Sequence, residues 1–374
     1  MLEDWLSKVR EEGKDAYARA NWPSQADSPT QKNYTRFEDF DLTKFQGESK
    51  TNVSFKTKGG IKALALGELK NEDLAIFTEK FSTTIPPSEH KMLALKDAWL
   101  ENGFLIHAPA ESEGEVEITC DANGVVGLHG IVVLEKNSNA KIYQKQNASG
   151  AMVAEATEVF CGEGSKLNFD YTQKMGFDSP FFTVKRAVLQ ENAKLIWNTA
   201  FFGGNSTIAT IDSKLDGEGS RAENYNAYFG SEKQVFDIST NSYHYTQKTG
   251  GNVLSKGVLT GEAQSTYRGL IHIAKTGQGT NCFLNGHALL LSEKAKANSV
   301  PSLEIFTNDV QSRHGATVDQ IDSEKVFYLN SRGLSKREAV KTIVEGFIGE
   351  VFQKSNGNAL KDWEEIFTER MESA

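Results

Sequence analysis

One histidine in this chain combines metal-binding chemistry with an accessible setting. His314 stands beside Gly315 between strand-like runs, shortly before the sequence changes to a helical pattern. Neutral imidazole binds ferrous iron and is a common partner of, or substitute for, thiolate at iron–sulfur centres. The glycine would let the backbone turn and leave one ring nitrogen accessible. The alternative is a hydrogen-bonded histidine at a corner of the fold, and the positive charge of Arg313 argues against a cation site.

Thiols are the other groups that could hold iron, and the chain has three cysteines, Cys120, Cys161 and Cys282, none in a CxxC pair. This spacing excludes a disulfide framework and fits a reducing compartment. Cys282 lies in the apolar run TNCFLNGHALLL. A free cysteine there is expected to be a small buried hydrophobe rather than a ligand. His287 in the same run is expected to be a polar surface histidine.

The sequence shows no nucleophile triad, no paired catalytic carboxylates, no Walker motif and no HExxH zinc pattern. Its glycine-rich stretches GEGSKL and GEGSRA precede strands rather than helices, so these glycines are expected at turns and not around a phosphate. The chain is therefore predicted not to be an enzyme, which favours a scaffold.

The net charge and hydropathy of the chain exclude two classes of binding partner, nucleic acids and membranes. The 374 residues carry a net charge of −9 with acids and bases interspersed, so nucleic acid is not expected to bind. The N-terminus lacks the apolar region of a signal peptide, and no apolar run reaches the ~20 residues that span a bilayer. A cytoplasmic protein without membrane contact is expected.

A repeating β pattern occupies residues 104–334. The third residue of a recurring small polar turn falls at Lys141, Lys166, Lys194, Arg221, Ser265 and Lys296, in steps of 25, 28, 27, 44 and 31 residues. A near-constant step predicts a solenoid, with one extra coil inside the long step. Alternation places Leu195, Trp197, Thr199 and Phe201 on the inner face of a coil. A β-sandwich would also give short strands, but without a turn repeating at one period.

Helical patterns flank this region, so three domains are predicted: 1–103, 104–334 and 335–374. The N-terminal domain is mostly helical and contains a hairpin or strand pair around Gly59 and Gly60.

Two helices are predicted in the C-terminal domain. Ser335 and Glu338 form a capping box before the first helix, and Gly357 is expected to end it. This helix carries a wide apolar stripe of Val340, Ile343, Val344, Phe347, Ile348, Val351 and Phe352. The second helix carries Leu360, Trp363, Ile366 and Phe367 on one face. The stripe could cap the end of the solenoid, dock a partner, or do both.

Residues 303–334, reading LEIFTNDVQSRHGATVDQIDSEKVFYLNSRGL, resemble the C-terminal core of the SufD family. SufD is the non-catalytic half of the SufB–SufD scaffold that assembles iron–sulfur clusters. The likeness extends upstream through residues 257–305, and weaker likenesses lie in residues 32–42 and 90–110. The family's frequent cysteine two places before the histidine is Ser312 here.

SufB-like sequences place an essential cysteine just before a Leu-Leu pair. The matching residues 285–288 of this chain contain no cysteine, so the resemblance is to SufD rather than to SufB.

The resemblance implies a mainly β protein, a right-handed parallel β-helix flanked by N-terminal and C-terminal helical domains. It further implies pairing with a SufB-like subunit through the C-terminal end of the β-helix and binding of a SufC-like ABC ATPase. His314 would lie at the SufB interface as a candidate metal ligand for iron entry. The candidate ATPase-docking residues are Val340, Val344, Phe347, Ile348, Val351 and Phe352.

No cofactor is expected to bind stably to this subunit alone, because Ser312 supplies no thiolate. The iron–sulfur cluster would be assembled transiently in the complex, and a homodimer stays open as the form without SufB. The alternatives are a SufB-like or homodimeric cluster scaffold and a β-helix carbohydrate-active enzyme. The latter needs carboxylates or basic residues clustered on one strand face, and none is visible in the sequence.

Overall fold

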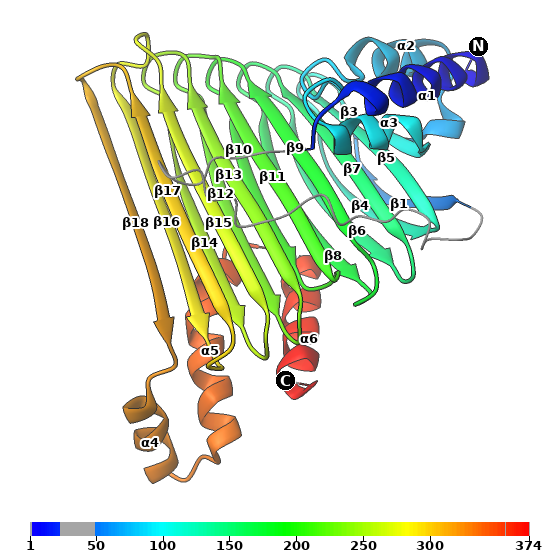
Figure 1. Ribbon diagram of the computed structural model, residues 1–374. Coiled ribbons are helices and arrows are strands. Elements are labelled where there is room, and N and C mark those ends of the chain that lie inside the picture. The colour runs from blue at the N-terminus through cyan, green and yellow to red at the C-terminus, as the bar shows by residue number, and fades with distance from the viewer. Residues whose placement is uncertain (1, 23–48, 356, 374) are drawn as a thin grey trace.

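The computed structural model describes residues 2–22, 49–355 and 357–373, so segment 32–42 of the resemblance lies outside the described residues. The strands wind into a parallel β-solenoid, with the N-terminal helices gathered near one end and the last two helices packed on the outer face of one wall (Figure 1). The predicted mainly β fold with flanking helices is confirmed.

Two nine-stranded sheets form the walls of the solenoid. The first sheet contains, in order, β1 (Lys50–Gly59), β4 (Glu113–Asn123), β6 (Asn139–Ala148), β8 (Lys166–Met175), β10 (Lys194–Phe201), β12 (Arg221–Gly230), β14 (Gly250–Leu259), β16 (Thr280–Leu290) and β18 (Val310–Gln320). The second sheet contains β2 (Lys62–Ala65), β3 (Leu100–Ala108), β5 (Val125–Leu134), β7 (Met152–Cys161), β9 (Phe181–Leu189), β11 (Ser206–Leu215), β13 (Val235–His244), β15 (Gln264–Ile273) and β17 (Lys296–Ile305). Because consecutive strands from β3 onward alternate between the sheets, each coil gives one strand to each wall.

Some of the turn positions that repeat in the sequence are also paired with each other in neighbouring strands, and others are not. The repeat positions that pair in one continuous register of the first sheet are Lys166, Lys194 and Arg221. Lys141 stands two positions out of that register. Ser265 and Lys296 belong to β15 and β17 of the second sheet, so the 44-residue step passes from one wall to the other. Arg221 pairs with Gly250 of β14 one coil later, and Ser265 lies on the opposite wall half a coil further, so the step contains half an additional coil and not the whole coil predicted.

The core runs along the inside of the solenoid as one hydrophobic cluster. Leu195, Trp197 and Phe201 of β10 belong to this cluster, and Thr199 between them is also buried. The predicted inner face is therefore confirmed. Each large side chain removed from water in this way contributes about 1.5–3 kcal/mol before the entropy of ordering is counted.

At the N-terminal end of the solenoid, antiparallel strands extend both sheets and helices pack on the outer face of the second sheet. β1 pairs antiparallel with β4 and β2 with β3, so the predicted strand pair exists but its members join different sheets instead of forming a hairpin. Helices α1 (Leu2–Arg19), α2 (Asn71–Lys80) and α3 (Lys91–Ala98), with the short 3₁₀ helix Leu66–Glu68, gather at this end (Figure 1). The strands of region 1–103 thus extend the solenoid walls.

A buried polar cluster fixes these helices to the second sheet. The Glu158 carboxylate accepts hydrogen bonds from the backbone N–H of Ser82 (2.6 Å) and Thr84 (2.5 Å) and lies 2.9 Å from His129 Nε2. Lys96 Nζ lies 2.6 Å from the other ring nitrogen. Burial, followed by the Lys96 charge, lowers the pKa of His129, so the ring is neutral and accepts from the lysine.

The β region ends earlier than predicted. The last strand, β18, ends at Gln320. The prediction that the β region extends to residue 334 is wrong, because α4 (Ser323–Ser331) occupies that stretch. The Asp322 side chain accepts from the N–H groups of Glu324 and Lys325 and so caps this helix. Phe327, Tyr328 and Leu329 of α4 are residue types that are common in strands, but the Asp322 cap starts a helix at this point.

The C-terminal helices confirm the capping box and correct one boundary. Ser335 and Glu338 form the box at the start of α5 (Lys336–Phe352). This helix ends at Phe352 instead of reaching Gly357, where α6 (Gly357–Ser373) begins. In the described part of the chain, no helix is long and apolar enough to cross a membrane.

Candidate functional site

His314 lies in the middle of β18, the edge strand of the first sheet. Its register partner is Leu284 of β16, which is buried in the core. Residues paired in parallel register share a face, so His314 belongs to the inner face of the terminal coil. Its side chain is nevertheless exposed, because no further strand follows β18 in the described residues. The alternative of a histidine at a coil corner is therefore wrong.

The neighbours of His314 differ from the expectation. Gly315 continues the strand, so it does not turn the backbone; a Cβ atom there would lie 2.8 Å from Asn285 Oδ1. Arg313 lies over the ring of Phe283, 5.7 Å from its centroid, and alternation puts it on the opposite face from His314. The arginine therefore does not share the side of the strand that His314 occupies.

His287 lies on the outer face of β16. Its Nδ1 is 2.9 Å from the Thr317 hydroxyl of β18. Burial, followed by the charge of Lys256, lowers its pKa. The half-buried ring thus lies at the outer surface of the sheet and joins the last two strands of the first sheet by a hydrogen bond.

Metal ligands do not cluster around His314. In the ranges that the structure covers, no group of three or more His, Cys, Asp or Glu side chains could enclose a metal ion. A metal held with His314 would thus draw most of its ligands from another molecule.

The apolar stripe of α5 faces the solenoid. Val344, Ile348, Val351 and Phe352 are buried in a cluster with outer-face residues of the first sheet, and Val340 and Phe347 are partly buried against it. This stripe, predicted to dock an ATPase, is instead packed within the chain. Two hydrogen bonds also hold α5 to the sheet: Lys256 Nζ donates to the Phe347 carbonyl (2.8 Å) and to Glu350 Oε2 (2.6 Å).

Helix α6 packs beside α5 on the same sheet. Trp363 is fully buried, and its indole N–H donates to the Thr172 hydroxyl at 2.5 Å. Asp362 accepts from the Tyr143 hydroxyl and from Lys145 Nζ, both at 2.7 Å.

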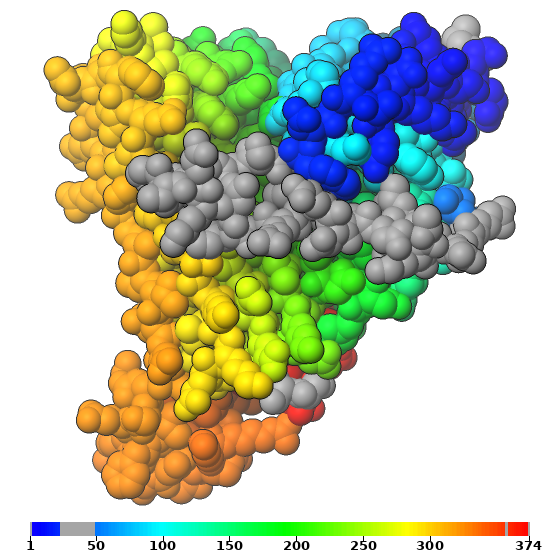
Figure 2. Space-filling model, in the orientation of Figure 1, coloured from blue at the N-terminus to red at the C-terminus, as the bar shows by residue number. Residues whose placement is uncertain are grey.

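Exposed aromatic side chains gather on α4 instead. Phe327 is 73% exposed and Tyr328 56% exposed. In Figure 2 the orange α4 region projects beyond the body of the solenoid, at the lower left. Of the C-terminal helices, α5 and α6 thus pack against the first sheet, whereas α4 projects and exposes apolar side chains.

A buried ion pair inside the solenoid was not anticipated from the sequence. Lys185 Nζ lies 2.9 Å from Glu155 Oε1, and both side chains are fully buried. Glu155 also accepts from Gln144 Nε2 (2.6 Å) and from the Tyr171 hydroxyl (2.7 Å). Burial lowers the pKa of Lys185 and raises that of Tyr171 well above its usual value. Each of the apolar runs MVAEATEVFC and FFTVKRAVL contains two charged residues, and these charges were the signal that could have revealed the pair.

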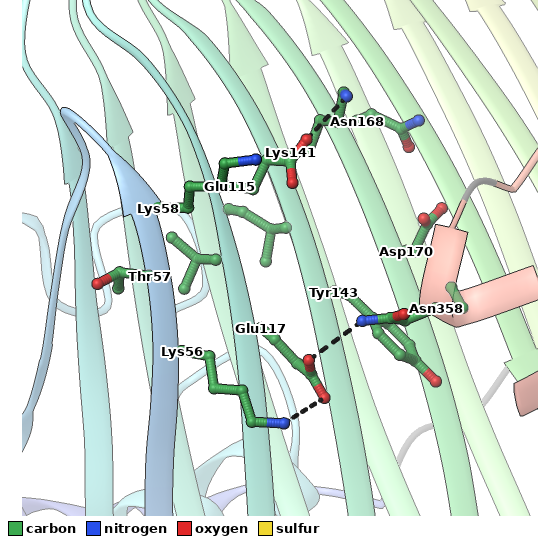
Figure 3. Close-up of a pocket in the computed structure, with 13 residues that line it drawn as sticks. Lys56, Thr57, Lys58, Glu115, Glu117, Lys141, Tyr143, Asn168, Asp170 and Asn358 are labelled. Atoms are coloured by element: carbon green, nitrogen blue, oxygen red, sulfur yellow. Dashed lines mark hydrogen bonds and ion pairs between the residues drawn. The ribbon is translucent and has the colours of Figure 1, made fainter.

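A shallow groove of about 310 Å³ lies on the outer face of the first sheet beside the start of α6 (Figure 3). Its lysines and carboxylates pair with each other: Lys56 with Glu117 at 3.6 Å and Lys141 with Glu115 at 2.9 Å. Asn358 of α6 donates to Glu117 at 3.4 Å. Since these charges compensate within the groove, it favours no ligand of a single sign.

These features describe a parallel β-solenoid protein whose candidate site lies on a strand edge. The family model for the SufBD core domain of SUF system FeS cluster assembly matches residues 118–347, more than half of the chain, from β4 into α5. The chain belongs to this family.

Its relatives include the iron–sulfur cluster assembly protein SufB of Bacillus subtilis, 27% identical over 295 residues, which are 75% of this chain and 62% of that protein. An iron–sulfur cluster assembly SufBD family protein of Staphylococcus saprophyticus is 26% identical over 296 residues, again 75% of this chain and 62% of the relative. The chain thus spans less than two thirds of the length of these relatives.

Proposed function

We propose that this chain is a SufD-like, non-catalytic subunit of a cytoplasmic iron–sulfur cluster assembly scaffold. The observation that carries the proposal is the exposed strand edge that holds His314 without a neighbouring exposed thiol. Residues 285–288 of β16, where SufB-like sequences have their essential cysteine, lie beside 315–318 of β18 and contain none. This edge can therefore supply an imidazole to a cluster but depends on a partner for an exposed thiolate.

The terminal coil suits a partner that adds strands. β17 and β18 are the edges of the two sheets, and an edge strand leaves backbone N–H and C=O groups free to pair with another chain. Exposed apolar side chains flank these edges: Ile305, Phe306 and Val318. A SufB-like subunit that continues both sheets would place its own groups beside His314. Without SufB, a second copy of this chain could use the same edges and form the homodimer.

The ATPase is proposed to dock on α4. The buried side chains of the α5 stripe face the solenoid, whereas Phe327 and Tyr328 face solvent. A SufC-like ATPase bound there would act on a helix that directly follows β18, the edge strand of the partner interface. ATP-driven movement of α4 would in this way reach the edge that carries His314.

A SufB-like or homodimeric scaffold is the second candidate, favoured by the name of the Bacillus relative. The absence of cysteine from residues 285–288 argues against it. Membership of the SufBD family displaces the carbohydrate-active enzyme as an interpretation.

Co-expression with SufB and SufC from the same organism, followed by size-exclusion chromatography, tests the proposal. A SufD-like chain should elute in a complex with both proteins. The double variant Phe306→Asp/Val318→Asp should lose SufB, while Phe177→Asp, a change at an exposed aromatic residue between β8 and β9, should retain it. If the chain forms no complex with SufB or SufC, the proposed function fails.

A further inference from the structure

Two opposite charges lie side by side on the outer face of the second sheet without pairing to each other. Glu158 of β7 and Arg186 of β9 are register partners, so their Cα atoms are about 4.8 Å apart and their side chains leave the sheet on the same face. Both side chains are shielded from water. Among the residues that the structure describes, no ion pair joins them. Opposite charges in this arrangement attract each other, so their separation needs a cause.

Other opposite charges that share this register pair directly. Glu115 of β4 and Lys141 of β6 are register partners, and Lys141 Nζ lies 2.9 Å from Glu115 Oε1. On its other side, Arg186 is the register partner of Asp212 of β11, and Arg186 Nε donates to Asp212 Oδ2 at 2.7 Å. The parallel register therefore permits direct pairs, and Glu158 and Arg186 are kept apart by something local.

The segment that separates them is residues 82–89, here called the strap, which lies between α2 and α3. Thr84 stands between the two charges: its N–H donates to Glu158 Oε1 at 2.5 Å, and its carbonyl accepts from the Arg186 guanidinium. The Ile85 N–H donates to the same carboxylate oxygen at 3.2 Å. Arg186 also donates to both carboxylate oxygens of Glu89, each at 2.9 Å. The strap thus takes the place of a direct ion pair.

Beyond Glu158 and Arg186, the strap has one apolar anchor. Ile85 is its one fully buried residue and joins the apolar cluster formed by α3 and the second sheet. The N–H groups of Thr83 and Glu89 bond to carbonyls three residues earlier in the chain. In the described residues, the strap therefore forms no ladder with a strand. A segment held in this way opens at a lower free energy than the sheet beneath it.

We propose that the strap is a two-state element. In the closed state, which the structure shows, it separates Glu158 from Arg186. In the open state it leaves the sheet, and the two side chains form a direct ion pair. His129 and Asp212 belong to the sheet and keep their contacts with Glu158 and Arg186 in both states. Opening then leaves neither charge without a partner, so direct pairing lowers its free energy.

The strap lies on the second sheet, whereas α5 and α6 pack on the first. The inference is therefore independent of the proposed function, and its experiments use neither SufB nor SufC. It adds a conformational change at the wall opposite the C-terminal helices.

Hydrogen exchange of the purified, full-length chain, measured by NMR at Thr84 and Ile85, tests the open state. These two amides donate to Glu158, so they exchange when the strap opens. They should exchange at least about tenfold faster than the amides of β7 and β9, and low urea concentrations should leave their rate unchanged, because strap opening exposes little surface. Strap amides that exchange no faster than those of the strands would overturn the proposal. This comparison needs no variant.

A double-mutant cycle tests the ion pair of the open state. Glu158→Gln and Arg186→Gln each remove strap contacts from the closed state, and each also removes the open-state pair. The double variant loses both sets of strap contacts but loses the pair only once. Its opening constant should therefore exceed the product of the two single effects by about two- to fivefold, the strength of a solvated ion pair. A double effect no larger than that product would count against the pair and overturn the proposal.

Glu89→Gln supplies the matched control. Glu89 lies on the strap and contacts Arg186 in the closed state, so its replacement should raise the opening constant without touching the open-state pair. Combined with Glu158→Gln, it should give a double effect equal to the product of the single effects. An excess as large as that of the Arg186 cycle would assign the coupling to the closed state, and the proposed open state would then be wrong.

Discussion

Replacing Lys185 by methionine should destabilise the protein strongly, because it leaves a buried carboxylate without its counter-ion. Lys185 Nζ lies 2.9 Å from Glu155 Oε1 and also donates to the Thr157 hydroxyl at 3.1 Å. After Lys185→Met, Glu155 retains hydrogen bonds from Gln144 and Tyr171 but must stay charged in the core or take up a proton. Removing one partner of a buried ion pair costs about 3–5 kcal/mol in the free energy of unfolding.

Urea unfolding followed by tryptophan fluorescence and by circular dichroism measures this loss, provided that the two transitions coincide. The double variant Lys185→Met/Glu155→Leu removes both charges and should recover at least about 2 kcal/mol of the loss, since apolar replacement of a buried pair is often nearly neutral. The control is Lys141→Met, which breaks an exposed pair with Glu115 and should cost less than about 1 kcal/mol. If Lys185→Met costs no more than this control, the buried pair does not stabilise the solenoid as argued.

The remaining predictions address pH, docking and the site. Burial lowers the pKa of His244 to about 4, so the unfolded chain binds the extra proton. Stability should therefore fall as the pH drops below about 6.5, by up to about 1.4 kcal/mol per unit for each such histidine, and His244→Gln should flatten the curve of unfolding free energy against pH. The double variant Phe327→Asp/Tyr328→Asp should abolish capture of SufC with an unchanged circular dichroism spectrum, and undiminished capture would contradict docking on α4. His314→Ala should leave assembly of the complex intact but slow cluster reconstitution, and a wild-type rate would remove this histidine from the site.

The solenoid could be predicted from the sequence because its signal is local and repeated. Lys166, Lys194 and Arg221 mark one turn that recurs in register, and alternation around Trp197 shows which side chains point inward. The repeat was assigned wrongly at Ser265, because the sequence analysis placed turns of both sheets in one series. A turn looks the same in sequence whether it starts a strand of the first sheet or of the second.

The C-terminal region was harder to predict because its features depend on distant residues. An apolar stripe on α5 shows that the helix buries one face, but whether against its own solenoid or a partner depends on Phe202, Tyr225 and their neighbours in the first sheet. The buried pair of Glu155 and Lys185 was missed for the same reason, since the two residues are 30 positions apart and meet only inside the fold.

The two ends of the solenoid differ in a way that bears on partner binding. At the N-terminal end, the edge strands β1 and β2 are antiparallel to their neighbours and helices pack nearby, whereas at the other end the parallel strands β17 and β18 form the edges in the described residues. In a solenoid, each coil is stabilised mainly by its neighbours, so a coil with one neighbour is the least stable. The terminal coil contains His314. A partner that adds strands would pair with the free edges of β17 and β18 in this coil. Partner binding and ordering of the site would then be one process, because the backbone pairing that stabilises β18 would also fix the position of His314.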